Sequence, residues 1–436
     1  MYKITYFILI YFLCLGAVFA QQEKGIFGVN NWLNNWTEFQ PNQEDYGDPA
    51  EILTGNITKD TKLLKRNVYL LMGNVFVTNE ATLTIEPGTV IIGDYDTKGT
   101  LVIARGSTIV ADGLETDPII FTSNRSRKKP GDWGGIFILG EAPTNKFGNG
   151  SVASFFPNLS PEHFQKTNYG GDNAFSHAGI LRYVRIEYAG ARIGRGIYAP
   201  GLMLAGIGQT TLVDHVMVSF SAGKAFEIWG GDFEMKNTIT YKSSQADLGF
   251  NYGAQVRISN SLVVRSPYAS HSSGARAIQI HSYSNESEVD FSKVGTKITA
   301  SNLTVINKTD DLKGDIEKGL IKEAVFIGHH ASLEMQRSVI SGFSPAVVFD
   351  NKIKVNQESL DKIKFSQMYF NNCSGNIFIE DFANNDDLEN WYGNPSFFNV
   401  YSKGLDTETF IDIFNGKKPD YRLRINQIMA TNDFGE

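Results

Sequence analysis

Cysteine is almost absent from this sequence: 436 residues contain only Cys14 and Cys373. Cys14 lies in an N-terminal segment that we expect to be removed, which would leave Cys373 without a partner for an intrachain disulfide. The fold must then be held by its packed core alone. Cys373, in the stretch NNCSGN, is interpreted as a structural thiol because no histidine lies near it in the sequence.

Proline is also scarce, with 13 residues against 42 glycines, and no long block of one charge occurs. The formal net charge of −7 argues against a nucleic-acid partner, which would require a basic face. The one compact basic run, RSRKK at residues 125–129, is interpreted as a solvated loop.

Residues 1–20 are predicted to be a signal peptide. Lys3 supplies a basic start, an apolar run extends from Ile4 to Phe19, and the small residue Ala20 precedes the expected cleavage point. A retained membrane anchor and lipidation of Cys14 are the alternatives, but the run is short and no stop-transfer charges follow it. We therefore expect an exported protein, located in the periplasm or at the outer membrane or cell surface.

Short β-branched and aromatic runs recur between residues 181 and 265, and Gly, Asn or Ser ends each run. Asp214, Asn237 and Asn260 mark the same position in three successive repeats, with a period of about 23 residues that is typical of one turn of a β-solenoid. Asn or Asp at one corner of stacked turns can hydrogen-bond to its copies above and below. These three residues are therefore predicted to form a structural ladder.

The predicted fold class is all-β, a parallel β-helix of the pectin-lyase-like type. Residues 21–50 are expected to form an arm or cap over the open first turn, residues 51–376 the β-helix, and residues 377–436 a C-terminal cap. Loop insertions are expected at 141–172, 285–294 and 308–322, and the last of these has the apolar spacing of a short helix. The first insertion is a candidate for ligand or partner contact because loops of this length are uncommon.

Polysaccharide lyases and glycoside hydrolases also use β-helix folds, so a cleavage of glycans would require their characteristic residues in this sequence. A lyase needs several carboxylates that bind Ca²⁺ and a basic residue, and a hydrolase needs carboxylates around one glycosidic bond. No such set recurs at the repeat spacing. Adjacent residues of a strand point apart, which argues against joint action by Asp214 and His215 or by His329 and His330. No catalytic residue, metal ligand or cofactor is therefore predicted.

Arg192, Arg195 and Tyr198, in the loop ARIGRGIYAP, are the candidate ligand-binding residues. Guanidinium groups and a tyrosine ring can bind an anion or a sugar through bidentate hydrogen bonds and stacking, and a solvated loop is the alternative. Arg185 and Glu187 share one face of a strand, which predicts an outward ion pair.

Several segments resemble the signature segments of a family of exported right-handed parallel β-helix proteins. This family is common in Bacteroidetes and is similar to a leptospiral outer-membrane lipoprotein family. The segments are GDWGGIFILG (131–140), YGG (169–171), LRYVRIEYAG (181–190), GLMLAGIGQTTLVDHVMVS (201–219) and FEIWGG (226–231). The resemblance implies a right-handed helix, a cell-envelope location associated with the outer membrane, and a TonB-dependent receptor as a candidate partner.

The leading hypothesis is a non-enzymatic scaffold or binding protein of the cell envelope. It would present a lateral face and long loops to an outer-membrane protein or a surface polysaccharide. A carbohydrate-active enzyme and a glycan-binding module without catalysis are the alternatives. Carboxylates that converge in a groove would favour the enzyme, and a row of aromatic rings would favour glycan binding.

Overall fold

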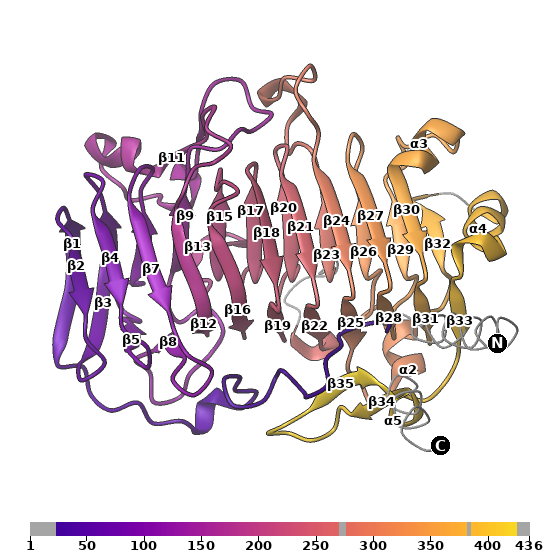
Figure 1. The fold of residues 1–436 in the computed structure, drawn as a ribbon, viewed down its shortest axis with the longest axis horizontal. Helices are drawn as coiled ribbons and strands as arrows, with labels where there is room; N and C mark the ends of the chain where they lie inside the picture. Colours follow the sequence, from indigo (N-terminus) through magenta and orange to yellow (C-terminus); the bar gives the residue numbers. More distant parts are fainter. Residues whose placement is uncertain (1–22, 270–275, 382–384, 425–436) are drawn as a thin grey trace, which may run out of the picture.

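The chain coils into a solenoid in which successive turns pair in parallel (Figure 1). The computed structural model describes residues 23–269, 276–381 and 385–424. The predicted signal peptide, residues 1–20, lies outside the described residues. No helix in the described ranges has both the length and the hydrophobicity needed to cross a bilayer.

The strands stack into three sheets, which we call sheets A, B and C. Sheet A is formed by β1 (Glu51–Ile57), β3 (Val68–Val77), β5 (Val90–Gly93), β8 (Ile119–Ser123), β12 (Gly179–Glu187), β16 (Leu212–Ser219), β19 (Ile239–Tyr241), β22 (Leu262–Arg265), β25 (Thr304–Asn307), β28 (Val339–Ser341), β31 (Tyr369–Asn371) and β33 (Val400–Ser402).

Sheet B contains the ends of β1 and β3, then β6 (Thr100–Ile103), β9 (Gly135–Leu139), β15 (Leu202–Ala205), β17 (Phe226–Trp229), β20 (Leu248–Asn251), β23 (Ile278–Ile280), β26 (Val325–Ile327), β29 (Val347–Phe349) and β32 (Ile377–Ile379). Sheet C contains β2 (Thr61–Leu63), β4 (Thr82–Ile85), β7 (Thr108–Asp112), the first halves of β12 and β16, β18 (Asp232–Lys236), β21 (Gln255–Ser259), β24 (Lys297–Ser301), β27 (Ser332–Gln336) and β30 (Ile363–Ser366).

One side of each strand faces a narrow apolar core. In β21, Val256 and Ile258 are buried while Arg257 between them is exposed, because successive side chains of a strand point to opposite faces. The core cluster is continuous from Leu63 in the first turns to Tyr392 beyond the last. The predicted all-β fold and parallel stacking of turns are confirmed.

The corner between sheets C and A is made by one residue with a positive φ angle in turn after turn. The residues at this corner are Tyr183, His215, Asn237, Asn260, Asn302, Arg337 and Gln367. The register pairs Asp214 with Lys236, so His215 and not Asp214 is the equivalent of Asn237. The predicted superposition is wrong by one residue at this turn, because the sequence pattern shows residue types and not backbone angles.

The predicted ladder residues are nevertheless in contact. Asn237 Nδ2 donates to Asp214 Oδ1 at 2.9 Å, and Asn260 Nδ2 donates to Asn237 Oδ1 at 2.8 Å. The backbone N–H of Phe27 donates to Asn260 Oδ1 at 2.9 Å. The structure therefore brings Asp214, Asn237 and Asn260 together along one edge, and the N-terminal arm continues the row.

The N-terminal arm does not cover the first turn, which corrects the predicted position of residues 21–50. It runs lengthwise along the helix from the last turns to β1, as the indigo trace shows (Figure 1). Gly25 N donates to Arg337 O at 2.8 Å, and Ile26 N donates to Thr304 Oγ1 at 2.9 Å. A short 3₁₀ helix, η2 (Pro41–Gln43), precedes the arrival of the arm at β1.

The arm lies there because the outer face of sheet A is apolar and needs a cover. Trp36 and Phe39 of the arm pack in one buried cluster with outward side chains of sheet A such as Tyr241. The hairpin of β34 (Phe410–Asp412) and β35 (Asp420–Leu423) adds Phe410 and Tyr421 to the same cluster. Burial of this second apolar surface stabilises the fold, in which Cys373, the cysteine of the described ranges, is free.

Residues 377–436, predicted to be a cap, have two roles in their described part. The helix α4 (Asp386–Tyr392) closes the end of the core with Leu388 and Tyr392. Beyond η7 (Pro395–Phe397) and β33, the helix α5 (Asp406–Thr409) leads to the hairpin that covers the side of the helix.

The three predicted insertions differ in their packing. Residues 141–172 form β10 (Gly150–Ser151), η3 (Ala153–Phe155), η4 (Pro161–Thr167) and β11 (Asn168–Tyr169). Phe156 and Tyr169 of this insertion pack on the outer face of sheet B beside Phe137. The second insertion contains η6 (Glu286–Glu288), and the third contains α2 (Leu312–Glu317), the expected short helix.

Candidate functional site

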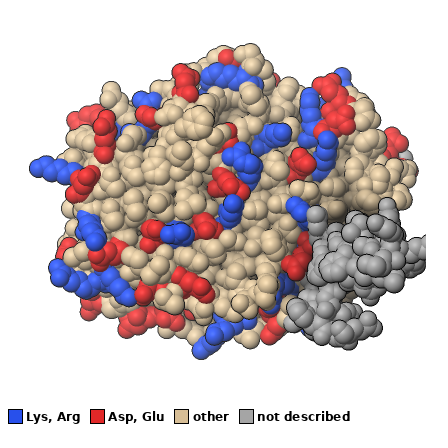
Figure 2. Space-filling model, viewed as in Figure 1, with Lys and Arg blue, Asp and Glu red and all other residues tan. Residues whose placement is uncertain are grey.

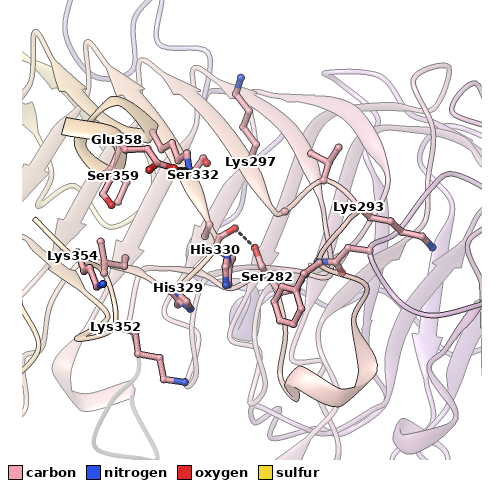
Figure 3. Close-up of a pocket in the computed structure, with 18 of the residues that line it drawn as sticks. Ser282, Lys293, Lys297, His329, His330, Ser332, Lys352, Lys354, Glu358 and Ser359 are labelled. Atoms are coloured by element: carbon pink, nitrogen blue, oxygen red, sulfur yellow. Dashed lines mark hydrogen bonds and ion pairs between the residues drawn. The ribbon is translucent and has the colours of Figure 1, made fainter. Parts of the chain in front are cut away.

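A cavity of about 500 Å³ opens at one edge of the helix, where loops lead from sheet B to sheet C (Figure 3). Its walls come from the loops before β24, β27 and β30, and the last of these loops contains α3 (Gln357–Lys362). Asn145 of the first long insertion reaches the same cavity and donates to Ser282 O at 2.9 Å. Segments far apart in sequence therefore build one site.

Basic side chains dominate the wall of this cavity. The lining contains only two carboxylates, Asp290 and Glu358, but five lysines: Lys293, Lys297, Lys352, Lys354 and Lys362. The whole chain carries a net charge of −7, so the basic character is local. Figure 2 shows basic and acidic side chains interspersed elsewhere on the face in view.

Three of the five lysines form no ion pair within the described residues, and of these Lys293 donates a hydrogen bond to Lys146 O at 2.8 Å. Lys352 forms an ion pair with Glu286 at 3.1 Å, and Lys362 pairs with Glu358 at 2.8 Å. Lys297 and Lys354, by contrast, have no ion-pair partner among the residues that the structure describes. Both are exposed, and in Figure 3 the Lys297 side chain points away from His329 and His330. Their ammonium groups are available to an anion.

The floor of the cavity carries two adjacent histidines. The ring centroids of His329 and His330 lie 3.9 Å apart, so the prediction that these side chains point apart is wrong. His330 has a φ angle of 61° and lies in a turn, where strand alternation does not hold. Burial, and then the neighbouring His329, lowers the pKa of His330, which favours the neutral form of its ring.

Aromatic rings extend this histidine pair toward the surface. Tyr283 Oη lies 3.3 Å from His329 Nδ1, and the ring of Phe291 lies 4.9 Å from that of His330. Burial, and then the hydrogen bond to Glu286, raises the pKa of Tyr283 to about 12. Phe291 is 53 % exposed, so the site offers an apolar ring beside its cations.

The sequence comparisons agree with this architecture. A profile of the pectate-lyase-like β-helix domain matches residues 55–399. The chain belongs to this family. The expected right-handed helix is thereby confirmed, and no curated protein matches the chain. In this pectate-lyase-like β-helix, no group of three or more His, Cys, Asp or Glu residues could hold a metal ion within the described ranges.

The predicted ligand residues lie on a different loop. Arg192 and Tyr198 are paired across a hairpin of β13 (Arg192–Gly194) and β14 (Ile197–Tyr198), and Arg195 is exposed in its turn. Arg192 Nε donates to Gly194 O at 2.9 Å. This hairpin connects sheet A to sheet B, whereas the lysine-lined cavity lies between sheets B and C. The structure therefore groups these three residues but does not bring them to the cavity.

The sequence did not predict the ion pair of Lys224 and Glu227 on the outer face of sheet B. Lys224 Nζ lies 2.5 Å from Glu227, and Trp229 Nε1 donates to the same carboxylate at 2.5 Å. A side chain at Gly249 would clash with this pair, since a Cβ atom there would lie 2.8 Å from Glu227. The signal that could have found it is the spacing of Glu227 and Trp229, which places both on one face of β17.

The predicted outward ion pair is present but buried. Arg185 Nε lies 3.1 Å from Glu187 Oε1, and the side chains are only 9 % and 1 % exposed. Tyr46 of the arm contacts both residues through its hydroxyl group. Burial raises the pKa of Glu187 despite the nearby guanidinium group. The expectation of solvent exposure is wrong because the arm covers this face of sheet A.

The prediction that the side chains of Asp214 and His215 point apart is also wrong. The φ angle of 52° at His215 turns the ring back, and Nδ1 lies 2.8 Å from Asp214 Oδ1. The rings of Trp36 and Tyr183 lie 5.5 and 4.4 Å from it. Burial acts to raise the pKa of Asp214, but hydrogen bonds from His215 and Asn237 lower it on balance. Asp214 and His215 therefore form part of the surface on which the N-terminal arm packs.

Proposed function

We propose that the protein is an exported, non-enzymatic binding protein that holds an acidic polysaccharide at the lysine-lined cavity. The observation that carries the proposal is the pair of unneutralised ammonium groups, Lys297 and Lys354, at a cavity with five lysines. The stacked strands below the cavity give it a rigid support, so little conformational freedom would be lost on binding.

The chemistry of the cavity suits a polymer with repeated carboxylate or sulfate groups. Successive anionic groups of such a chain can contact successive lysines, and each contact weakens as salt screens it. Phe291 and Val294, which are 53 % and 69 % exposed, offer apolar surface to the faces of sugar rings. A neutral glycan would use only the second of these contacts.

Binding to polygalacturonate, measured by calorimetry at low ionic strength, tests the proposal. We expect the variant K297A/K354A to bind about tenfold more weakly than the wild type, since each exposed contact contributes up to about 1 kcal/mol. The matched control is K313A/K318A, in α2 and at the residue that follows it, which removes two exposed lysines at the opposite edge of the β-helix. Equal affinity of the two variants, or equal binding to neutral dextran, would contradict a cavity-based site.

The Lys224–Glu227 pair favours a second candidate function, the cleavage of a glycan on the outer face of sheet B. In this ion pair the Lys224 ammonium group can donate a proton and the Glu227 carboxylate can accept one, and the Trp229 indole N–H holds the same carboxylate in place. Incubation with the same polymer separates the two functions. New unsaturated or reducing ends that disappear in E227Q would establish an enzyme and overturn the non-enzymatic proposal.

The cell-envelope location and the protein partner also belong to this proposal. They are supported by the predicted signal peptide and by the resemblance to exported β-helix proteins. We propose a position in the periplasm or on the cell surface, with a TonB-dependent receptor as a candidate partner. Cell fractionation followed by cross-linking at the native location tests both, and recovery of the protein in the cytoplasm would refute them.

A further inference from the structure

A chain of hydrogen bonds leads from the surface to one histidine of the lysine-lined cavity. Lys352 Nζ donates to Glu286 Oε1 at 3.1 Å, and Tyr283 Oη donates to the same oxygen at 3.0 Å. Tyr283 Oη also lies 3.3 Å from His329 Nδ1. Tyr283 and Glu286 belong to the loop before β24, whereas His329 and Lys352 belong to the loops before β27 and β30. The chain of hydrogen bonds therefore joins three successive turns.

The direction of each hydrogen bond follows from the groups that form it. The hydrogen bond from Lys352 lowers the pKa of Glu286, which keeps this residue a carboxylate that only accepts. Tyr283 must therefore donate its single hydroxyl proton to Glu286, and its oxygen can only accept from His329. His329 then carries its proton on Nδ1. In the neutral ring, the other nitrogen, Nε2, has a lone pair and no proton.

This second nitrogen of His329 is available to a ligand. His329 lines the cavity and Tyr283 does not, so Nδ1 is turned away from the cavity. The side chain is half-buried, and Nε2 has no hydrogen-bond partner within the described ranges. The lysines of the cavity only donate hydrogen bonds, whereas this nitrogen only accepts them. The cavity therefore combines cations with a single hydrogen-bond acceptor of a different kind.

The turn that carries His329 is fixed by its neighbours. Ser282 Oγ donates to His330 O at 2.6 Å, as the dashed line in Figure 3 shows, and accepts from Thr296 N at 2.8 Å. The ring of His330 lies against that of His329, with their centroids 3.9 Å apart. A hydrogen bond weakens steeply when its angle is poor, so an acceptor held in one orientation is selective.

We infer that Nε2 of His329 accepts a hydrogen bond from a hydroxyl group of the bound polymer and so determines which polyanions the cavity holds. This inference rests on the proposed function and adds a specificity-determining residue to it. The ammonium groups attract any polyanion. A carboxylate or sulfate oxygen at Nε2 would bring two acceptors together without a proton, which is unfavourable. The cavity therefore prefers a polymer with free hydroxyl groups beside its acidic groups.

The position of the proton on His329 can be measured without a ligand. At pH 8, above the ordinary titration range of histidine, ¹⁵N NMR of the ring nitrogens should place the proton of His329 on Nδ1 in the wild type. Y283F keeps the aromatic ring but removes the hydroxyl group that accepts from Nδ1, so it should give a mixture of both tautomers. A proton on Nε2 in the wild type would overturn the inference.

Calorimetry with two forms of polygalacturonate tests the contact with the ligand. One form is unmodified, and the other is O-acetylated, which keeps its carboxylates but blocks its hydroxyl donors. We expect the ratio of the two affinities to be up to about tenfold larger for the wild type than for H329F, which lacks the acceptor. Y283F should also lower the ratio, although His329 itself is retained. The matched control is H177F, an exposed histidine outside the cavity, which should keep the wild-type ratio.

The outcomes separate this inference from the proposed function. If H329F binds the unmodified polymer and leaves the ratio unchanged, the inference is wrong and the proposed function stands. If H329F lowers the ratio and Y283F does not, His329 acts through its shape and not through the tautomer, and the inference is again wrong. Failure of the wild type to bind unmodified polygalacturonate would overturn the proposed function, and this inference with it.

Discussion

Asn237 donates a hydrogen bond to Asp214 across 2.9 Å, and its own carbonyl oxygen accepts one from Asn260 at 2.8 Å. The side chain thus joins three turns of the helix. Its φ angle of 50° lies in the left-handed region, which asparagine tolerates better than most residues. Asn237 therefore both adopts the left-handed backbone angle of the corner and forms the hydrogen bonds that link neighbouring turns.

Substitution of Asn237 separates these two contributions. We expect N237A to lower the free energy of unfolding by about 2–3 kcal/mol, because it adds backbone strain and leaves polar neighbours unpaired. N237G should lower the free energy of unfolding by less than N237A does, since glycine adopts the left-handed backbone angle without strain and only the hydrogen bonds are lost. Urea unfolding monitored by circular dichroism measures both variants, and equal losses would show that the backbone angle contributes nothing.

The attachment of the arm depends on Trp36, whose side chain is fully buried and packs edge-on against the stacked rings of Tyr183 and His215. We expect W36A to cost about 3–5 kcal/mol, as truncation of a large core residue does. Because the arm lies outside the main core, the loss should appear as release of the arm rather than as loss of the β-helix. Limited proteolysis should cut within residues 23–50 of W36A while circular dichroism retains the strand signal.

The half-buried Trp32 is the control for this experiment. Its ring also stacks near Trp36, at a centroid distance of 6.2 Å, but it is more exposed. W32A should therefore release the arm less readily than W36A. Cleavage at the same rate in both variants would show that the buried position of Trp36 is not what holds the arm.

The pH dependence of stability should reflect His281. Burial, and then the positive charges of Lys224 and Arg276, lowers the pKa of His281 to about 4. The unfolded chain binds a proton near the ordinary value of about 6.5, whereas the folded protein does not until pH 4. Between these values the unfolded state holds more protons, so the free energy of unfolding falls as pH decreases.

A comparison of wild type with H281Q measures this contribution. The wild type should lose up to about 3 kcal/mol between pH 6.5 and pH 4 through this residue, and H281Q should lack that part of the slope. Glutamine preserves a polar contact to Gln279, which lies 2.9 Å from His281 Nε2. Identical slopes for the two proteins would place the titrating group elsewhere.

Cys373 should resist chemical modification in the native protein. The thiol is buried, and burial raises its pKa to about 11. At pH 8 the thiolate fraction is then about 100-fold lower than for an unperturbed thiol. We expect reaction with iodoacetamide to be at least that much slower in buffer than in urea, measured by mass spectrometry. Rapid native labelling would indicate that this part of the last turns opens easily.

The repeat itself could be predicted from the sequence because it is local. Asn237 and Asn260 stand 23 residues apart, and the apolar alternation around them is regular. The predicted equivalence of Asp214 with Asn237 is wrong by one residue, because His215 has the left-handed backbone angle and Asp214 does not. Residue type at a corner is visible in a sequence, but the backbone angle that a histidine adopts there is not.

The position of the arm and the composition of the cavity could not be predicted in the same way. Lys24 contacts carbonyl groups 344 and 374 residues away, and no periodic pattern connects such partners. The lysines of the cavity come from two connections: Lys293 and Lys297 from the loop that leads into β24 and the first residue of that strand, and Lys352, Lys354 and Lys362 from the loop before β30. Only the folded stack, which sets those loops side by side, brings Lys297 and Lys354 to one site.

The arm also has a consequence for the order of events during synthesis. Residues 24–26 are made early, yet the groups that hold them, from Thr304 to Phe398, are made much later. Most of the chain must therefore be synthesised before the N-terminal arm can dock on the β-helix. In a chain that stops early, the N-terminal arm would stay undocked and the apolar outer face of sheet A would stay exposed. Quality-control proteases could recognise incomplete chains by this exposed surface.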